Sequence, residues 1–78
     1  MRSGGIIVEN IKCILGKNIQ QERLKRSLTQ TQLSVKAEVS LTAICSAERG
    51  TQNMTIDTVE RIANALEIPF SDLLQDKK

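Results

Sequence analysis

The sequence contains no histidine, tryptophan or tyrosine, only one phenylalanine, Phe70, and only one proline, Pro69. A core without aromatic rings must be aliphatic, and this composition favours helices over sheets. Without histidine the chain lacks a common metal ligand and general base, and it has neither paired acids at catalytic spacing nor a glycine-rich phosphate loop. These absences argue against an enzyme, and we expect no metal, no cofactor and no small-molecule substrate.

The cysteine content is also low, and it indicates a compartment. Cys13 and Cys45 form no CxxC pair, which fits reduced thiols better than a disulfide framework. No run approaches the roughly 20 apolar residues that cross a bilayer, and the stretch Ile6 to Val8 is too short for the core of a signal peptide. We therefore expect a cytoplasmic protein that does not associate with membranes.

Size and charge set further limits. A chain of 78 residues forms one domain, and a domain of this size buries only about 60% of its unfolded surface. We expect a flexible segment at 1–5, a folded domain at 6–74 and a flexible tail at 75–78. The net charge of +2 permits nucleic-acid binding without itself indicating it.

The apolar positions between Gln30 and Arg49 predict two short helices that pack against each other, which is helix-turn-helix spacing. Thr29 and Ser40 precede the two helices and can cap their free amides. Ser34 is small where the helices must approach closely. The predicted contact residues are Leu33 and Ala37 on the first helix, Ile44 and Ala47 on the second, and Val39 at the corner.

The corner itself is unusual, because Glu38 stands where the backbone needs a positive φ that glycine adopts without steric cost. We expect Glu38 to adopt this conformation with a strain of about 1 kcal/mol.

The flanking segments predict three more helices and no sheet. Before the pair, an amphipathic stripe runs towards Arg26 through Ile7, Ile11, Ile14, Leu15 and Ile19. Gly16 interrupts this stripe, and we interpret it as a close-packing site; the alternative is a break that makes Ile6 to Ile14 a separate arm. After Gly50, a helix capped by Thr55 carries the stripe Ile56, Val59, Ile62, Ala63 and Leu66, and Pro69 begins a short final helix.

Several segments together resemble the XRE and lambda-repressor-like DNA-binding domains over Leu15 to Leu74. They are Ile19 with Arg23, TQTQLS, the VS that opens the next helix, IC-S-A-ERG and TVERIANALEIPFSDLL. The resemblance implies an all-α, five-helix lambda-repressor-like domain, here with an extended N-terminal helix or arm.

Domains of this family place the third helix in the major groove of double-stranded DNA and the second across the phosphates. The resemblance implies a recognition helix at about Ser40–Glu48. It implies base contacts from Leu41, Thr42 and Ser46, and phosphate contacts from Thr29, Gln30, Ser40 and Arg49. Leucine offers only apolar contact, for example to a thymine methyl, and the two hydroxyls discriminate weakly, so we expect DNA shape to contribute to sequence selection.

Arg23 and Glu48 match a charged pair that links the first helix to the end of the third in some family members. Such a pair would orient the recognition helix without touching DNA. Ser27 and Glu38 depart from the family pattern, which commonly has glycine at both positions.

The segment ERGTQNMTIDTVERIANALEIP also resembles the small controller proteins of restriction-modification systems, which act as dimers. Phage repressors and antitoxins stay open as alternatives. We expect a homodimeric, sequence-specific transcriptional regulator that binds a two-fold symmetric operator. Its predicted dimer interface is Phe70, Leu73 and Leu74, and their alternative role is in the intrachain core.

Two other functions fit parts of the sequence. The modest charge and weak base-contacting residues are consistent with a helix-turn-helix protein-interaction module without specific DNA binding. A redox sensor is also conceivable, because oxidation of Cys45 would add bulk near the DNA.

Overall fold

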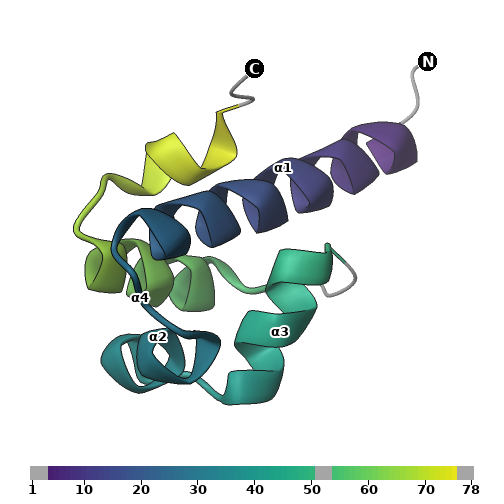
Figure 1. The fold of residues 1–78 in the computed structure, drawn as a ribbon. Helices are drawn as coiled ribbons and strands as arrows, with labels where there is room; N and C mark the ends of the chain where they lie inside the picture. The colour runs from purple at the N-terminus through teal and green to yellow at the C-terminus, as the bar shows by residue number, and fades with distance from the viewer. Residues whose placement is uncertain (1–3, 51–53, 76–78) are drawn as a thin grey trace.

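The computed structural model describes residues 4–50 and 54–75, with side chains from residue 11 onward. These ranges contain four α-helices, one 3-10 helix and no strand (Figure 1): α1 Gly4–Lys25, α2 Gln30–Ala37, α3 Leu41–Arg49, α4 Ile56–Leu66 and η1 Phe70–Leu74. The all-helical fold is as predicted, but the element predicted as a fifth helix is a 3-10 helix. The flexibility predicted for residues 1–3 and 76–78 concerns positions outside the described ranges.

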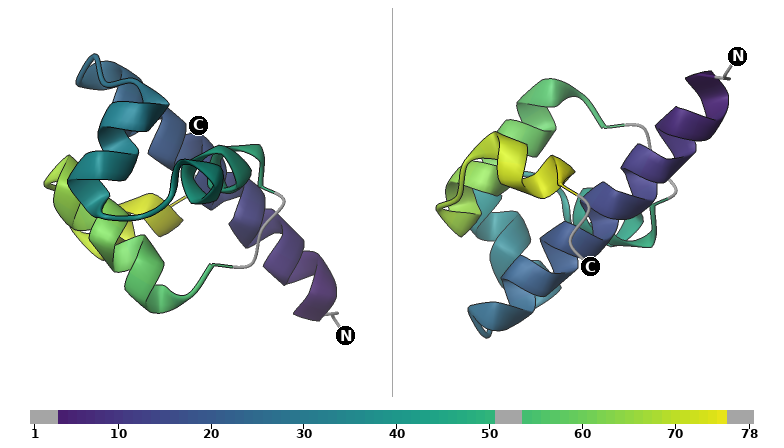
Figure 2. Two further views of the ribbon diagram at one scale, coloured as in Figure 1. Left: turned by 90° about the horizontal axis from the view of Figure 1, so that it is seen from below. Right: turned by 90° about the horizontal axis from the view of Figure 1, so that it is seen from above.

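The long helix α1 is continuous through Gly16, so the alternative of a break there is wrong. Its 22 residues extend about 33 Å in a molecule whose longest dimension is 40 Å. Figure 2 shows its N-terminal end projecting beyond the other helices. Despite its length, neither α1 nor another helix in the described ranges is apolar enough to cross a bilayer.

Gly16 lies at a close approach between α1 and α3. A Cβ atom at this position would collide with the carbonyl oxygen of Ala47 and lie 3.0 Å from that of Glu48. The interpretation of Gly16 as a close-packing site is therefore confirmed. Gly50 then ends α3 with a φ of 72°, the left-handed conformation that glycine adopts most readily.

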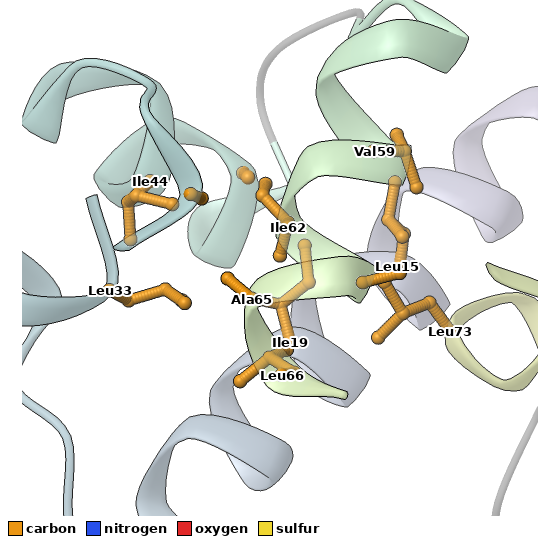
Figure 3. Close-up of a cluster of buried hydrophobic side chains, with 12 residues drawn as sticks. Leu15, Ile19, Leu33, Ile44, Val59, Ile62, Ala65, Leu66 and Leu73 are labelled. Atoms are coloured by element: carbon orange, nitrogen blue, oxygen red, sulfur yellow. The ribbon is translucent and has the colours of Figure 1, made fainter. Parts of the chain in front are cut away.

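The core is aliphatic, as the composition predicts, and Figure 3 shows how its side chains converge from all five elements. The predicted contacts of the helix pair are all buried, with Val39 partly buried at the corner. Among the described members of the predicted stripes, three are not buried: Ile11 is 44% exposed, Ile14 is partly buried, and Ile56, the first residue of α4, is 69% exposed. The side chain of Ile7 lies outside the described residues. The largest fully buried side chains are Ile19, Leu33, Ile44, Ile62, Leu66 and Leu73.

The final element is tied to α1 by Asn18. Its buried side-chain nitrogen Nδ2 donates hydrogen bonds of 2.7 Å to the carbonyl oxygens of Leu73 and Gln75. The element η1 begins directly after Pro69 and has only five residues, and a segment this short commonly forms a 3-10 helix instead of an α-helix. Because Leu73 is fully buried within the chain, it has no surface to offer a second chain, and its assignment to the dimer interface is corrected to the core.

Residues other than glycine adopt positive φ just after three of the helices: Ser27 at 56° after α1, Glu38 at 61° after α2 and Glu67 at 62° after α4. The left-handed conformation costs an L-residue about 1–2 kcal/mol, so each turn is locally strained. The predicted positive φ of Glu38 is confirmed, and its backbone N–H donates to the carbonyl oxygens of α2 that the helix end leaves free. The positive φ of Glu67 was not predicted.

The contact at Gly16 generates a prediction that opposes helix propensity. Alanine favours a helix interior by about 1 kcal/mol over glycine, yet Gly16→Ala should lower the free energy of unfolding by about 1–3 kcal/mol, because the added methyl group meets backbone atoms of α3. Urea unfolding measures the change, and Gln20→Ala on the exposed side of α1 is the control. A stabilised Gly16→Ala variant would contradict the close packing of α1 and α3.

Candidate nucleic-acid interface

The first turn of α2 is organised by a reciprocal cap. Thr29 Oγ1 accepts a hydrogen bond of 3.0 Å from the backbone N–H of Gln32, and the Gln32 side-chain oxygen accepts one of 2.8 Å from the backbone N–H of Thr29. The first N–H groups of an α-helix have no partner within the helix, and the helix dipole makes this end positive. The start of α2 therefore has the chemistry to bind an anion such as a phosphate.

The corner that follows brings α3 against α2. Ser34 is buried, its hydroxyl donates to the carbonyl oxygen of Thr31 at 2.7 Å, and its own carbonyl oxygen accepts the N–H of Val39 at 3.0 Å. Ser40 then caps α3, because its Oγ accepts the N–H of Ala43 at 3.0 Å. The predicted caps Thr29 and Ser40 are both confirmed.

One face of α3 points away from the core. Thr42, Cys45, Ser46 and Arg49 recur at three and four positions, which places them on the side opposite the buried Ile44 and Ala47. We call these four residues the outer face of α3. Thr42 and Arg49 are exposed, and Cys45 and Ser46 are half-buried. Leu41, at the start of the helix, is 43% exposed and flanks this face.

An ion pair with little solvent exposure fixes the end of α3 to α1. Arg23 Nε lies 2.7 Å from Glu48 Oε2 and Arg23 Nη2 lies 3.0 Å from Glu48 Oε1, while Nη1 donates to the carbonyl oxygen of Leu28 at 2.9 Å. The Arg23 and Glu48 side chains are 10% and 3% exposed. The hydrogen bonds to Glu48 raise the pKa of Arg23 above its usual value, against the opposing effect of burial, so the guanidinium stays charged.

The side chain of Gln30 is held between two residues of α3. Its Nε2 donates to Glu48 Oε1 at 3.0 Å, and its Oε1 accepts a hydrogen bond from Cys45 Sγ at 3.3 Å. Gln30 was expected only as a phosphate contact, and sequence reasoning missed its partner Cys45. A signal was present, because Cys45 and Glu48 lie three positions apart on a helix and can face the same neighbour.

The two other residues predicted at the dimer interface lie on η1. Phe70 is partly buried against the core, and Leu74 is 40% exposed on η1. Among the described side chains, no group of three or more His, Cys, Asp or Glu residues could hold a metal ion.

Sequence comparison places this geometry in a family. Residues 19–73 match the helix-turn-helix family, and this range runs from the core of α1 through α2, α3 and α4 into η1. The chain belongs to the helix-turn-helix family. The ion pair and the outer face of α3 both lie within the matched range.

Individual relatives include regulators of two kinds. The chain is 35% identical over 69 residues to control protein C.BamHI of Bacillus amyloliquefaciens, covering 87% of this chain and 85% of the relative. It is 35% identical over 63 residues to the immunity repressor protein of Bacillus phage phi105, covering 81% of this chain but 44% of the relative. The crystal structure of the restriction-modification controller protein C.Esp1396I superimposes with a TM-score of 0.75 at 30% identity, covering 82% of this chain and 86% of that one.

The Arg23–Glu48 pair gives a test of the helix-turn-helix geometry. Glu48→Ala should lower the free energy of unfolding by about 3–5 kcal/mol, because it leaves the buried Arg23 charge without its partner. Urea unfolding again provides the measurement. Asp57→Ala removes an exposed ion pair, Arg61–Asp57, and should cost at most about 1 kcal/mol. Equal effects of the two substitutions would show that Glu48 has no special role in holding α3.

Proposed function

We propose that this protein is a sequence-specific DNA-binding transcriptional regulator that acts as a homodimer on a two-fold symmetric operator. The observation that carries the proposal is the outer face of α3, presented to solvent on a helix whose end is anchored by the Arg23–Glu48 pair. Membership of the helix-turn-helix family and 35% identity to a control protein and to a phage repressor support the same function.

In the proposed complex α3 lies in the major groove, and Leu41, Thr42 and Ser46 face base edges. The exposure of Leu41 and Thr42 leaves both side chains accessible to DNA. Leu41 can contact a thymine methyl, whereas a single hydroxyl discriminates weakly between bases. Part of the sequence preference then comes from the energy of deforming the DNA.

Phosphates are bound at the edges of this contact. Arg49 is exposed and contributes a positive charge, and the hydroxyl groups of Thr29 and Ser40 accept backbone hydrogen bonds, which leaves each hydroxyl proton available to donate. The start of α2 adds the backbone N–H of Gln30 and its positive dipole end. These contacts position the protein on the duplex, while the base contacts select the sequence.

Selection from random duplex DNA at near-physiological salt tests the proposal. We expect enrichment of a symmetric motif whose half-sites are about 34 Å apart. Thr42→Ala and Ser46→Ala should each lower the affinity for this motif, or the preference for it over other sequences, by about fivefold. This is the factor that corresponds to about one neutral hydrogen bond. Gln20→Ala, at an exposed position of α1, is the control and should leave selection unchanged. If no motif is enriched, the protein is better explained as a protein-interaction module.

The proposed dimer uses the surface around η1, where Leu74 is exposed and Phe70 partly so. Exposed leucine on so short an element is apolar surface that a second copy of the chain could cover. Leu73 is excluded from this interface because it is fully buried.

Sedimentation measures this assembly directly. The wild-type protein should be dimeric at high micromolar concentration. Leu74→Glu should raise the dissociation constant of the dimer at least tenfold, because a charge would have to be buried in the interface. A tenfold change corresponds to about 1.4 kcal/mol. Ile56→Glu places the same charge on the exposed start of α4 and should leave the dimer intact. A wild-type protein that is monomeric throughout this range would refute the dimer.

A further inference from the structure

Gln30 connects the beginning of α2 to the outer face of α3 through two hydrogen bonds. On one side its Oε1 accepts from Cys45 Sγ at 3.3 Å, and on the other its Nε2 donates to Glu48 Oε1 at 3.0 Å. We propose that this Cys45–Gln30–Glu48 bridge is a positioning device that sets base specificity, and that the Gln30 side chain acts through it and not as a phosphate ligand. The inference rests on the proposed function, in which α3 enters the major groove.

The orientation of the Gln30 amide is determined by the charge of Glu48. An ionised carboxylate accepts hydrogen bonds and cannot donate them, so the NH₂ group of the amide must face Glu48. Glu48 cannot turn away, because Arg23 holds both of its oxygens. The amide oxygen therefore faces Cys45, and the thiol is the donor that satisfies it.

The bridge joins the two parts of the proposed DNA contact. Gln30 is the first residue of α2, next to the backbone N–H groups proposed to bind a phosphate, and Cys45 lies between Thr42 and Ser46 on the outer face of α3. A shift of α3 relative to α2 would move the base-contacting side chains relative to the phosphate contacts. The bridge opposes such a shift near the centre of α3, whereas the Arg23–Glu48 pair acts only at its end.

The two cysteines allow a matched experiment. Each variant is titrated with the duplex selected by the wild-type protein and with a scrambled duplex of the same length, and the ratio of the two affinities is the readout. Cys45→Ala should lower this ratio about fivefold, the factor expected for one hydrogen bond. Cys45→Ser keeps a donor and should stay within twofold of wild type. Cys13→Ala, at the exposed cysteine of α1, should have no effect.

A double-variant cycle separates the bridge from a direct contact between Cys45 and a base. If the thiol acts through Gln30, the double variant Gln30→Ala with Cys45→Ala should have the ratio of Gln30→Ala alone. Losses that multiply would overturn the proposal. An unchanged ratio in Cys45→Ala, or a Cys45→Ser variant as impaired as Cys45→Ala, would also overturn it.

Uncharged methylphosphonate linkages, placed at one position of the selected duplex at a time, test the phosphate alternative. The sensitive positions should be the same for wild type and Gln30→Ala, because the backbone N–H remains in the variant. Loss of sensitivity at one position in Gln30→Ala would identify the side chain as a phosphate ligand and refute the bridge as its role.

Thiol reactivity tests the bridge without DNA, so its failure is distinguishable from failure of the proposed function. Cys13 is exposed and should react first with Ellman's reagent, and Gln30→Ala should accelerate the slower reaction of Cys45 several-fold. An unchanged Cys45 rate would refute the bridge even in a protein that selects DNA. Conversely, if Gln30→Ala accelerates the Cys45 reaction but the wild-type protein prefers no duplex, the bridge exists and both the proposed function and the role of the bridge in specificity are refuted.

Discussion

The position of α3 depends on its contacts with α1. Isolated helices shorter than about 12–15 residues are only marginally stable in water, and α3 has nine residues. It buries only Ile44 and Ala47 in the core. The missing constraint comes from α1: the ion pair of Arg23 with Glu48 and the close backbone approach at Gly16 both act on the last turn of α3. The long helix α1 therefore supports α3 and fixes its last turn.

This arrangement divides α3 into two parts. Its C-terminal turn carries Glu48, which is almost fully buried, while its N-terminal turn exposes Leu41 and Thr42. In the anchored turn the Glu48 side chain is buried, whereas Arg49 beside it and the first two residues of α3 stay exposed. Gln30 lies between these parts and links α2 to both Cys45 and Glu48. The same side chains that stabilise the fold thereby determine where the outer face of α3 points.

The sequence predicted the elements that follow from local rules. The caps Thr29, Ser40 and Thr55, the core of the helix pair and the close packing at Gly16 were all identified from residue type and spacing. The errors occurred at positions whose burial depends on tertiary contacts. Periodicity assigned Ile11 and Ile56 to buried stripes. Ile11 lies in the half of α1 whose end projects beyond the other helices (Figure 2), and Ile56 is the first residue of α4. Periodicity does not reveal how far a neighbouring element extends along a helix.

The candidate site was less predictable for the same reason. Leu73 could have faced a second chain or the core; in the structure it packs into the hydrophobic cluster, and Asn18 holds its backbone against α1. Cys45 and Gln30 are 15 positions apart, so their contact depends on the angle between α2 and α3 rather than on a motif. The family resemblance supplied roles for Gln30 and Glu48, but it could not show that these side chains bond to each other in this chain.

In the proposed complex, the start of α2 and the outer face of α3 together form the DNA-binding surface. The most direct measurement is a titration of the isotopically labelled protein with the selected duplex, followed by amide NMR shifts residue by residue. The largest shifts should occur at the first turns of α2 and α3, with little change along η1. Shifts concentrated on α4 and η1, with Leu41 and Thr42 unaffected, would contradict this account of the surface.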